Sequence, residues 1–194
     1  MKTFLDAIRT LKDEEIARRY AIMNSFDGIL TTFGIILAQF FANVSNPKLV
    51  IVSCMGAAIA MGVSGTWGAY FTEKAERKKK LREIERHLLR KLKDTHPEFK
   101  MKITTFLIAI VDGIAPLISS IIIIIPFILS LSGILSVEMA FYYAFFIIIV
   151  LLFILGILIG KIAKENLILS GIKMLFIGIA VGIIIYFMDN IKQL

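Results

Sequence analysis

Five long stretches of predominantly apolar residues constrain the fold of this chain more than any other feature of its sequence. They are Tyr20–Ala42, Lys48–Phe71, Ile103–Ser130, Met139–Gly160 and Asn166–Asp189. Each can cross the hydrocarbon core of a bilayer, about 30 Å thick, as a helix of roughly 20 residues. The chain is 58% hydrophobic, against roughly 45–50% in soluble domains. The sequence therefore predicts an all-α polytopic membrane protein with five transmembrane helices.

The connections between these stretches predict how the spans are organised. NVSNP joins the first two and LSGILSV joins the third and fourth, and connections this short make antiparallel neighbours. The expected organisation is an amphipathic N-terminal segment (1–19), transmembrane helices 1–2 (20–71), a basic helical segment (72–102) and transmembrane helices 3–5 (103–194). The basic segment is a charged cytoplasmic helical extension between the second and third spans.

The distribution of Lys and Arg predicts the orientation in the membrane. These residues are concentrated before Tyr20, between Glu73 and Lys102, and between Lys161 and Lys164, which the five-span topology puts on one side. Cytoplasmic loops carry the excess of basic residues. We therefore expect a cytoplasmic N-terminus and a C-terminus outside the cell or in a lumen. The formal charge of +7 follows from this rule, and we expect no nucleic-acid partner.

Two carboxylates inside the spans, Asp27 and Asp112, are the first candidates for a functional site. An ionisable side chain at membrane depth is costly and marks a functional position by default. Met23 and Thr31 lie one helical turn on either side of Asp27, and Asn24 precedes it by three residues. Oxygen ligands with a thioether suit a borderline transition metal, although Met also fills gaps in apolar helices.

The basic segment offers a second candidate metal site. Glu76, Glu83 and His87 share one face of the expected helix, with Glu73 nearby. They form either a stripe of metal ligands or a solvated helix face with favourable pairs four residues apart, such as Glu73 with Arg77. The sequence contains no zinc, thiol-pair, nucleophile-and-base or phosphate-loop motif, so we expect no enzyme and no resident cofactor.

Small residues in the second span predict close helix packing. Gly56, Ala60, Ser64 and Gly68 follow one another at four-residue intervals. Small residues at this spacing let helix backbones approach closely within lipid.

Two segments, RRYAIMNSFDGILTTFGIILA and GAAIAMGVSGTWGAYFTEKAERKKKLREIE, are similar to the first two spans of the vacuolar iron transporter family. The resemblance implies a homodimer of five-span subunits that exports Fe²⁺, and also Mn²⁺, from the cytoplasm in exchange for protons. It implies that Asp27 and Met61 line the pore. It also implies that glutamates of the cytoplasmic helix capture the metal, which here are Glu73 and Glu76, with Glu83 slightly offset. The basic character of this helix and the presence of Asp112 depart from the family pattern.

Two other hypotheses remain open at this stage. Under the first, the chain is a non-transporting membrane scaffold of the same fold, which the shortage of acidic residues in the basic segment suggests. Alternatively, Asp27 and Asp112 form the acid dyad of an intramembrane enzyme, which requires the two carboxylates to be close together.

Overall fold

The computed structural model describes residues 11–88 and 96–191, and all regular structure among them is helical. The helices are α2 (Leu11–Phe41), α3 (Pro47–Leu88), α4 (His96–Leu131), α5 (Val137–Ala163) and α6 (Leu167–Ile191). All five are long and apolar enough to cross a membrane, which confirms the predicted fold class. Residues 1–10 of the predicted amphipathic segment and residues 89–95 of the predicted basic segment lie outside the described part.

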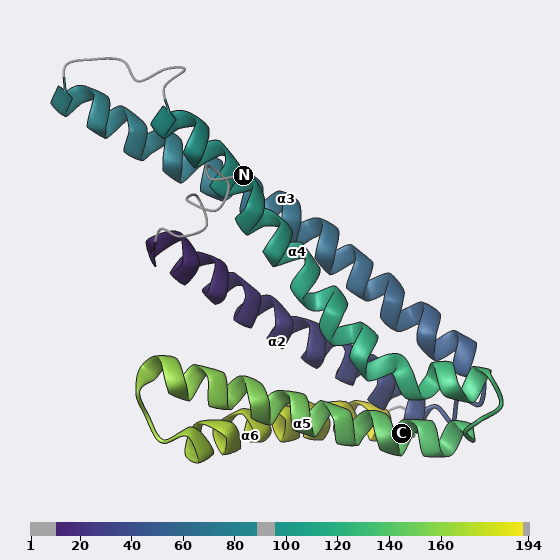
Figure 1. Ribbon diagram of the computed structural model, residues 1–194. Coiled ribbons are helices and arrows are strands. Elements are labelled where there is room, and N and C mark those ends of the chain that lie inside the picture. The colour runs from purple at the N-terminus through teal and green to yellow at the C-terminus, as the bar shows by residue number, and fades with distance from the viewer. Residues whose placement is uncertain (1–10, 89–95, 192–194) are drawn as a thin grey trace. The chain divides into compact units, whose positions relative to one another are not determined.

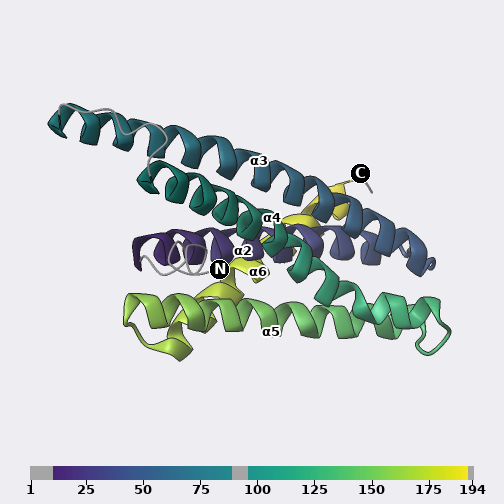
Figure 2. The same cartoon turned by 45° about the horizontal axis from the view of Figure 1, so that its top comes forward.

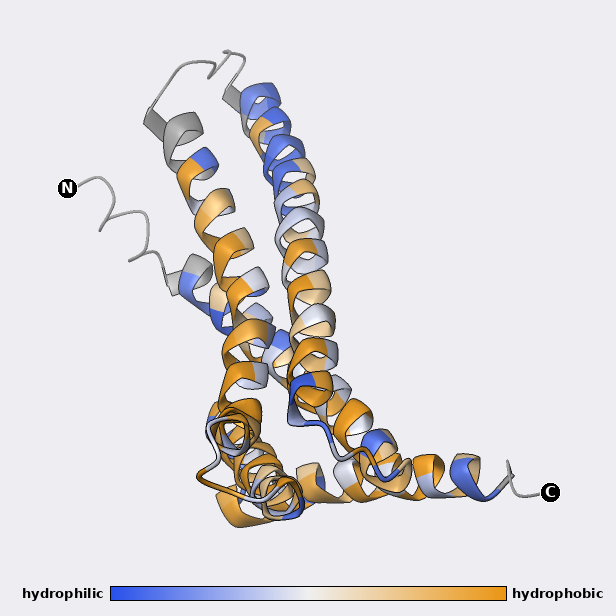
Figure 3. Cartoon of the chain, turned by 90° about the vertical axis from the view of Figure 1, so that its right-hand side faces the viewer, coloured by the Kyte–Doolittle hydropathy of each residue, from blue (hydrophilic) through white to orange (hydrophobic). Residues whose placement is uncertain are grey.

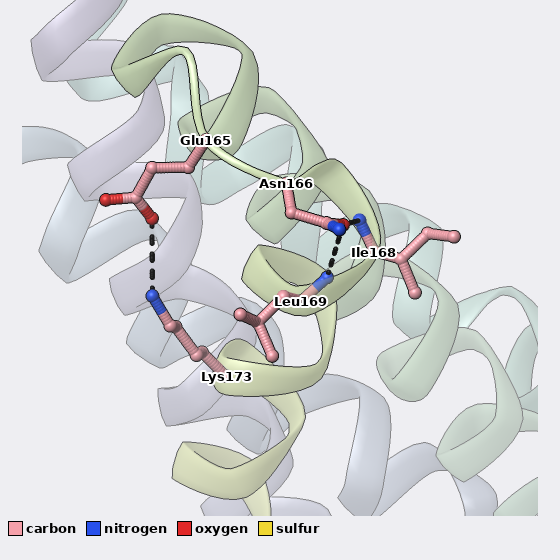
Figure 4. Close-up of polar contacts among 5 residues, drawn as sticks. All are labelled: Glu165, Asn166, Ile168, Leu169 and Lys173. Carbon is pink, nitrogen blue, oxygen red and sulfur yellow. Dashed lines mark hydrogen bonds and ion pairs between the residues drawn. The ribbon is translucent and has the colours of Figure 1, made fainter.

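Side chains at the helix starts satisfy backbone groups that the helices leave without partners. Ser136 accepts a hydrogen bond from the backbone N–H of Met139 at the start of α5. Asn166 does the same for α6, since its Oδ1 accepts from the N–H groups of Ile168 and Leu169 at 3.0 and 3.2 Å (Figure 4). Such caps replace the missing intrahelical partners of the first turn. The connection between α5 and α6 is therefore tight and well defined.

The chain divides into two compact units, and α2, α3 and α4 each contribute to both. The first unit comprises Met1–Asn24 and Met61–Ala115, and the second comprises Ser25–Ala60 and Pro116–Leu194. In the first unit the later part of α3 and the early part of α4 run side by side (Figures 1 and 2). The approach is close, because a Cβ atom on Gly113 would lie 2.5 Å from the backbone oxygen of Gly62.

The second unit contains the apolar core of the chain. Phe127 of α4 is fully buried and meets Phe141 of α5 edge to face, with the ring centroids 4.9 Å apart. A buried hydrogen bond of 2.8 Å joins the hydroxyls of Thr32 in α2 and Ser120 in α4. Since lipid supplies no alternative partner for a hydroxyl, such bonds fix which helix faces meet.

Helices α5 and α6 form an antiparallel hairpin within this second unit (Figure 1). Their backbones meet at glycines, since a Cβ atom on Gly156 would lie 2.5 Å from the carbonyl oxygen of Ser170 and 2.6 Å from the Cα of Gly171. Only a glycine at position 156 leaves room for this approach.

Helix α3 is much longer than a membrane requires. Its 42 residues correspond to about 63 Å at 1.5 Å per residue, twice the hydrocarbon thickness. Its apolar first part continues without interruption into a hydrophilic end (Figure 3). The predicted charged helical extension is thus confirmed as far as Leu88.

The glycine contact between α5 and α6 generates a stability prediction. Gly156→Ala should lower the free energy of unfolding by about 1–3 kcal/mol, because the added methyl group meets backbone atoms that have no rotamer to change. Thermal unfolding of the purified protein in detergent measures this.

Gly34→Ala is the matched control, because the nearest atom to its Cβ position is the flexible end of Ile185 at 3.6 Å. This control should be as stable as the parent chain or slightly more so, given the higher helix propensity of alanine. Equal stability of the two variants would contradict the close packing of α5 on α6.

Candidate functional site

Buried polar side chains within the first unit meet around Asp112 of α4. Asp112 is only 3% exposed, and the side-chain amide of Asn24 in α2 donates a hydrogen bond to its carboxylate. The other carboxylate oxygen faces α3, where a Cβ atom on Gly65 would lie 2.9 Å from it. Glycine at position 65 therefore leaves space for this carboxylate. Polar groups at membrane depth require such partners, because lipid offers none.

A second buried carboxylate, that of Glu73, lies further along α3 in the same unit. Glu73 is 7% exposed. It accepts a hydrogen bond of 3.5 Å from the Tyr20 hydroxyl of α2 and pairs with Arg77 at 3.4 Å. The pairing of Glu73 with Arg77, one of the two possibilities that the sequence left open, is confirmed. A metal at Glu73 would have to displace these protein partners.

Asp27 lies in a different environment, on the surface of the second unit. Its side chain is exposed, whereas the neighbouring Gly28 is buried against α4, with its Cβ position 2.7 Å from the Cα of Pro116. The Asp-Gly pair therefore combines a close helix contact with an outward-facing carboxylate. The glycine is needed because a side chain at position 28 would overlap the backbone at Pro116.

Met61 is half-buried and begins the α3 part of the first unit. Asp27 belongs to the second unit. Their pairing in one site stays a prediction.

The remaining predicted ligands lie on the hydrophilic end of α3. Glu76 and Glu83 are exposed, and the Nδ1 atom of His87 lies 2.7 Å from the backbone oxygen of Glu83. Residues 11–88 and 96–191 contain no group of three His, Cys, Asp or Glu side chains placed to hold a metal. Capture of a metal by this stripe stays a prediction.

The contact between Asn24 and Asp112 is the feature that sequence reasoning missed. The sequence associates Asn24 with Asp27, three residues away on the same helix, but the structure pairs it with a residue 88 positions away. Both are polar residues at membrane depth near the predicted cytoplasmic ends of their spans, and this shared depth is a signal that could have found the pair.

The five apolar helices make this chain an integral membrane protein. The sequence profile of the Major Facilitator Superfamily matches residues 7–191, and the chain belongs to that superfamily. Membership of this superfamily indicates a secondary membrane transporter, in agreement with the class predicted from the sequence.

The chain is also similar to an uncharacterized protein of Methanocaldococcus jannaschii, MJ0645. The two are 34% identical over 186 residues, which cover 94% of this chain and 93% of the relative. Similarity over nearly the whole of both chains extends to all five spans. The narrower resemblance to vacuolar iron transporters stays a prediction.

The Asn24–Asp112 contact can be tested with a double-mutant cycle. Asn24→Ala, Asp112→Ala and the double variant should show a coupling energy of about 1 kcal/mol or more, because a hydrogen bond to a buried carboxylate exceeds an ordinary one. Thermal unfolding in detergent supplies the free energies of unfolding.

A cycle between Asn24 and Thr32 is a suitable control, because the structure joins Thr32 to Ser120 instead. Additive effects are expected there. Additivity in the Asn24–Asp112 cycle would show that the two side chains do not interact in the folded protein.

Proposed function

We propose that this transporter moves Fe²⁺, and also Mn²⁺, out of the cytoplasm in exchange for protons. The observation that carries the proposal is the exposed carboxylate of Asp27 within α2, in a transmembrane stretch with a mean hydropathy of 1.5. A carboxylate facing outward at that depth is too costly to be incidental. The resemblance of the first two spans to vacuolar iron transporters supports a divalent metal as its partner.

The coupling follows from a competition for one carboxylate. In a medium of low dielectric constant a carboxyl group favours its protonated, neutral form, whereas a bound dication favours the anion. A proton and a metal ion therefore exclude each other at Asp27. If the site opens alternately to the two sides of the membrane, the proton gradient drives metal export.

Met61 would supply a soft ligand to the same ion. Asp27 lies seven residues after Tyr20 and Met61 ten before Phe71, or roughly 10 and 15 Å from the cytoplasmic ends of their spans at 1.5 Å per residue. The α2–α3 hairpin is held at its other end by a hydrogen bond of 2.7 Å from Gln39 to Ser53. A thioether beside a carboxylate favours Fe²⁺ over Mg²⁺ or Ca²⁺.

A second copy of the chain would complete the site, and we propose a homodimer. The small residues Gly56, Ala60, Ser64 and Gly68 of α3 are all exposed, and the Cβ positions of Gly56 and Gly68 have no atom within 4 Å. A surface of this kind accepts another helix closely within lipid. A partner covering it near Asp27 would remove the carboxylate from hydrocarbon and place two carboxylates and two thioethers around one ion.

The count of spans also supports a second copy. The described residues provide five spans, whereas transporters of this superfamily place the substrate between two halves of six helices each. Two copies of the chain would supply ten spans, two fewer than those two halves, in a comparable pairwise arrangement.

The acidic residues of the first unit would bind the metal ion before it reaches the transport site. Exposed Glu76 and Glu83 are available for first capture of the metal. Glu73 and Asp112 would bind metal only by exchanging their present contacts with Tyr20, Arg77 and Asn24. We therefore expect this basic helix to capture the metal ion more weakly than a helix with an acidic stripe would.

Orientation is the first prediction of this proposal. A reporter fused after Leu194 should be outside or in a lumen, and one inserted near Lys93 should be cytoplasmic, because the basic loops resist translocation. Cysteine labelling in intact cells and in permeabilised cells measures both, with a reporter after Ser132 as an outside control. Cytoplasmic labelling at both test positions would overturn the five-span topology.

Transport is tested in proteoliposomes with an imposed pH gradient and Fe²⁺ or Mn²⁺. Asp27→Asn should give a folded, dimeric protein whose proton-coupled metal flux falls to the background of empty liposomes, because the amide neither holds a dication nor exchanges a proton. Asp189→Asn, which changes a carboxylate near the end of α6, is the matched control and should keep its flux.

Met61→Leu keeps the packing volume and removes only the soft ligand. Its Fe²⁺ flux relative to Mg²⁺ flux should fall by about tenfold, the order of a single lost ligand interaction. Full coupled flux in Asp27→Asn excludes the proposed mechanism, and absence of flux in the parent protein supports the scaffold hypothesis instead.

A further inference from the structure

One face of α3 changes from aromatic to basic where the helix reaches the end of its apolar part. Trp67 and Phe71 are 57% and 59% exposed on this face, and Lys74, Lys78 and Arg82 continue it, all exposed. Successive spacings of four, three, four and four residues keep these side chains on one side of the helix. We refer to Lys74, Lys78 and Arg82 as the basic face.

The aromatic residues mark the depth at which this face begins. Trp67 and Phe71 stack with ring centroids 5.8 Å apart, and Lys74 lies over the ring of Tyr70 at 5.2 Å. Trp and Tyr concentrate at the boundary between hydrocarbon and headgroups. The basic face therefore starts at the level of the lipid headgroups.

The rise of the helix gives the reach of each basic side chain. Lys74 and Lys78 lie about 5 and 10 Å beyond Phe71 along the axis, and Arg82 lies about 16 Å beyond it. The headgroup region is about 5–7 Å thick on each side. The long side chains of Lys74 and Lys78 can reach it, whereas Arg82 contributes through its field, which is screened over about 8 Å.

Neighbouring acidic residues leave the membrane-proximal part of this face positive. The carboxylate of Glu73 already accepts a hydrogen bond from Tyr20 and forms an ion pair with Arg77. The exposed Glu76 and Glu83 project from other sides of the helix, since residues one or two positions apart do not face each other. Glu85 lies at the far end of the face, beside Arg82, and so reduces the charge away from the membrane only.

We propose that the basic face of α3 binds the headgroups of anionic phospholipids, with Lys74 and Lys78 as the principal contacts. The complementary charge, the exposure of these side chains and their continuity with the aromatic boundary support this occupant. Basic clusters immediately outside a transmembrane helix attract anionic lipid in this way. The inference is independent of the metal and of the direction of transport. The small residues of the proposed dimer contact share this side of α3 but end at Gly68, before the basic face begins at Lys74.

Trp67 is the only tryptophan of the chain and provides a direct probe of this face. The protein is reconstituted in vesicles of equal parts phosphatidylglycerol and phosphatidylcholine, with brominated acyl chains on one lipid at a time. Bromine quenches tryptophan only at short range, so the quenching compares the two lipids beside Trp67. Brominated phosphatidylglycerol should quench more, with a relative binding constant of about five, as one or two basic side chains near an anionic surface would give.

Charge variants distinguish an effect of the basic face from an effect of the overall charge of the protein. In Lys74→Gln/Lys78→Gln the relative binding constant should fall towards one, and Lys78→Gln alone should give about half of the loss. The control Lys80→Gln/Lys161→Gln removes the same charge from the opposite side of α3 and from the end of α5, and should leave the constant unchanged.

Two results would overturn the proposal. One is equal quenching of the parent protein by the two brominated lipids. The other is an equal loss of preference in the control pair, which would assign the effect to overall charge. The emission maximum of Trp67 in vesicles without bromine checks that each variant keeps the fold around it.

Discussion

The hydrocarbon core of a membrane offers no hydrogen-bond partner, and the polar contacts of this protein follow from that constraint. Backbone groups are satisfied within helices. Side chains inside the spans find partners on other helices, as Thr32 does with Ser120 and Asn24 does with Asp112. Each such pair specifies which faces of two helices meet, more sharply than apolar contacts could, because Leu and Ile pack almost as well against lipid as against protein.

Glycines make these contacts geometrically possible. Gly28 allows α2 to approach α4 at Pro116, and Gly113 allows α4 to approach α3 at Gly62. Both glycines directly follow an aspartate, Asp27 and Asp112. The close helix contacts and the intramembrane carboxylates are therefore neighbours in the sequence, so that a change in one contact would move the adjacent carboxyl group.

The all-α fold and the number of spans could be predicted from the sequence because hydrophobic length determines them. The sequence could also predict the hydrophilic continuation of α3 and the Glu73–Arg77 pair, since both depend on residues close in sequence. The sequence gives only the shared depth of Asn24 and Asp112, which makes them candidates for a contact. It does not say that α2 lies against α4 as well as against its neighbour α3, and the contact requires that arrangement.

The short connection between α5 and α6 has a consequence for the order in which the molecule assembles. Closing a short loop costs little chain entropy, so the last two spans can associate as soon as both have entered the bilayer. The polar contacts of the first unit join residues 53 and 88 positions apart, and they require α3 and α4 to be in place before α2 can pair with them. Residues far apart in sequence meet more slowly. The hairpin of α5 and α6 can thus form as a local folding unit, whereas the buried carboxylates acquire their partners only after the intervening chain has crossed the membrane.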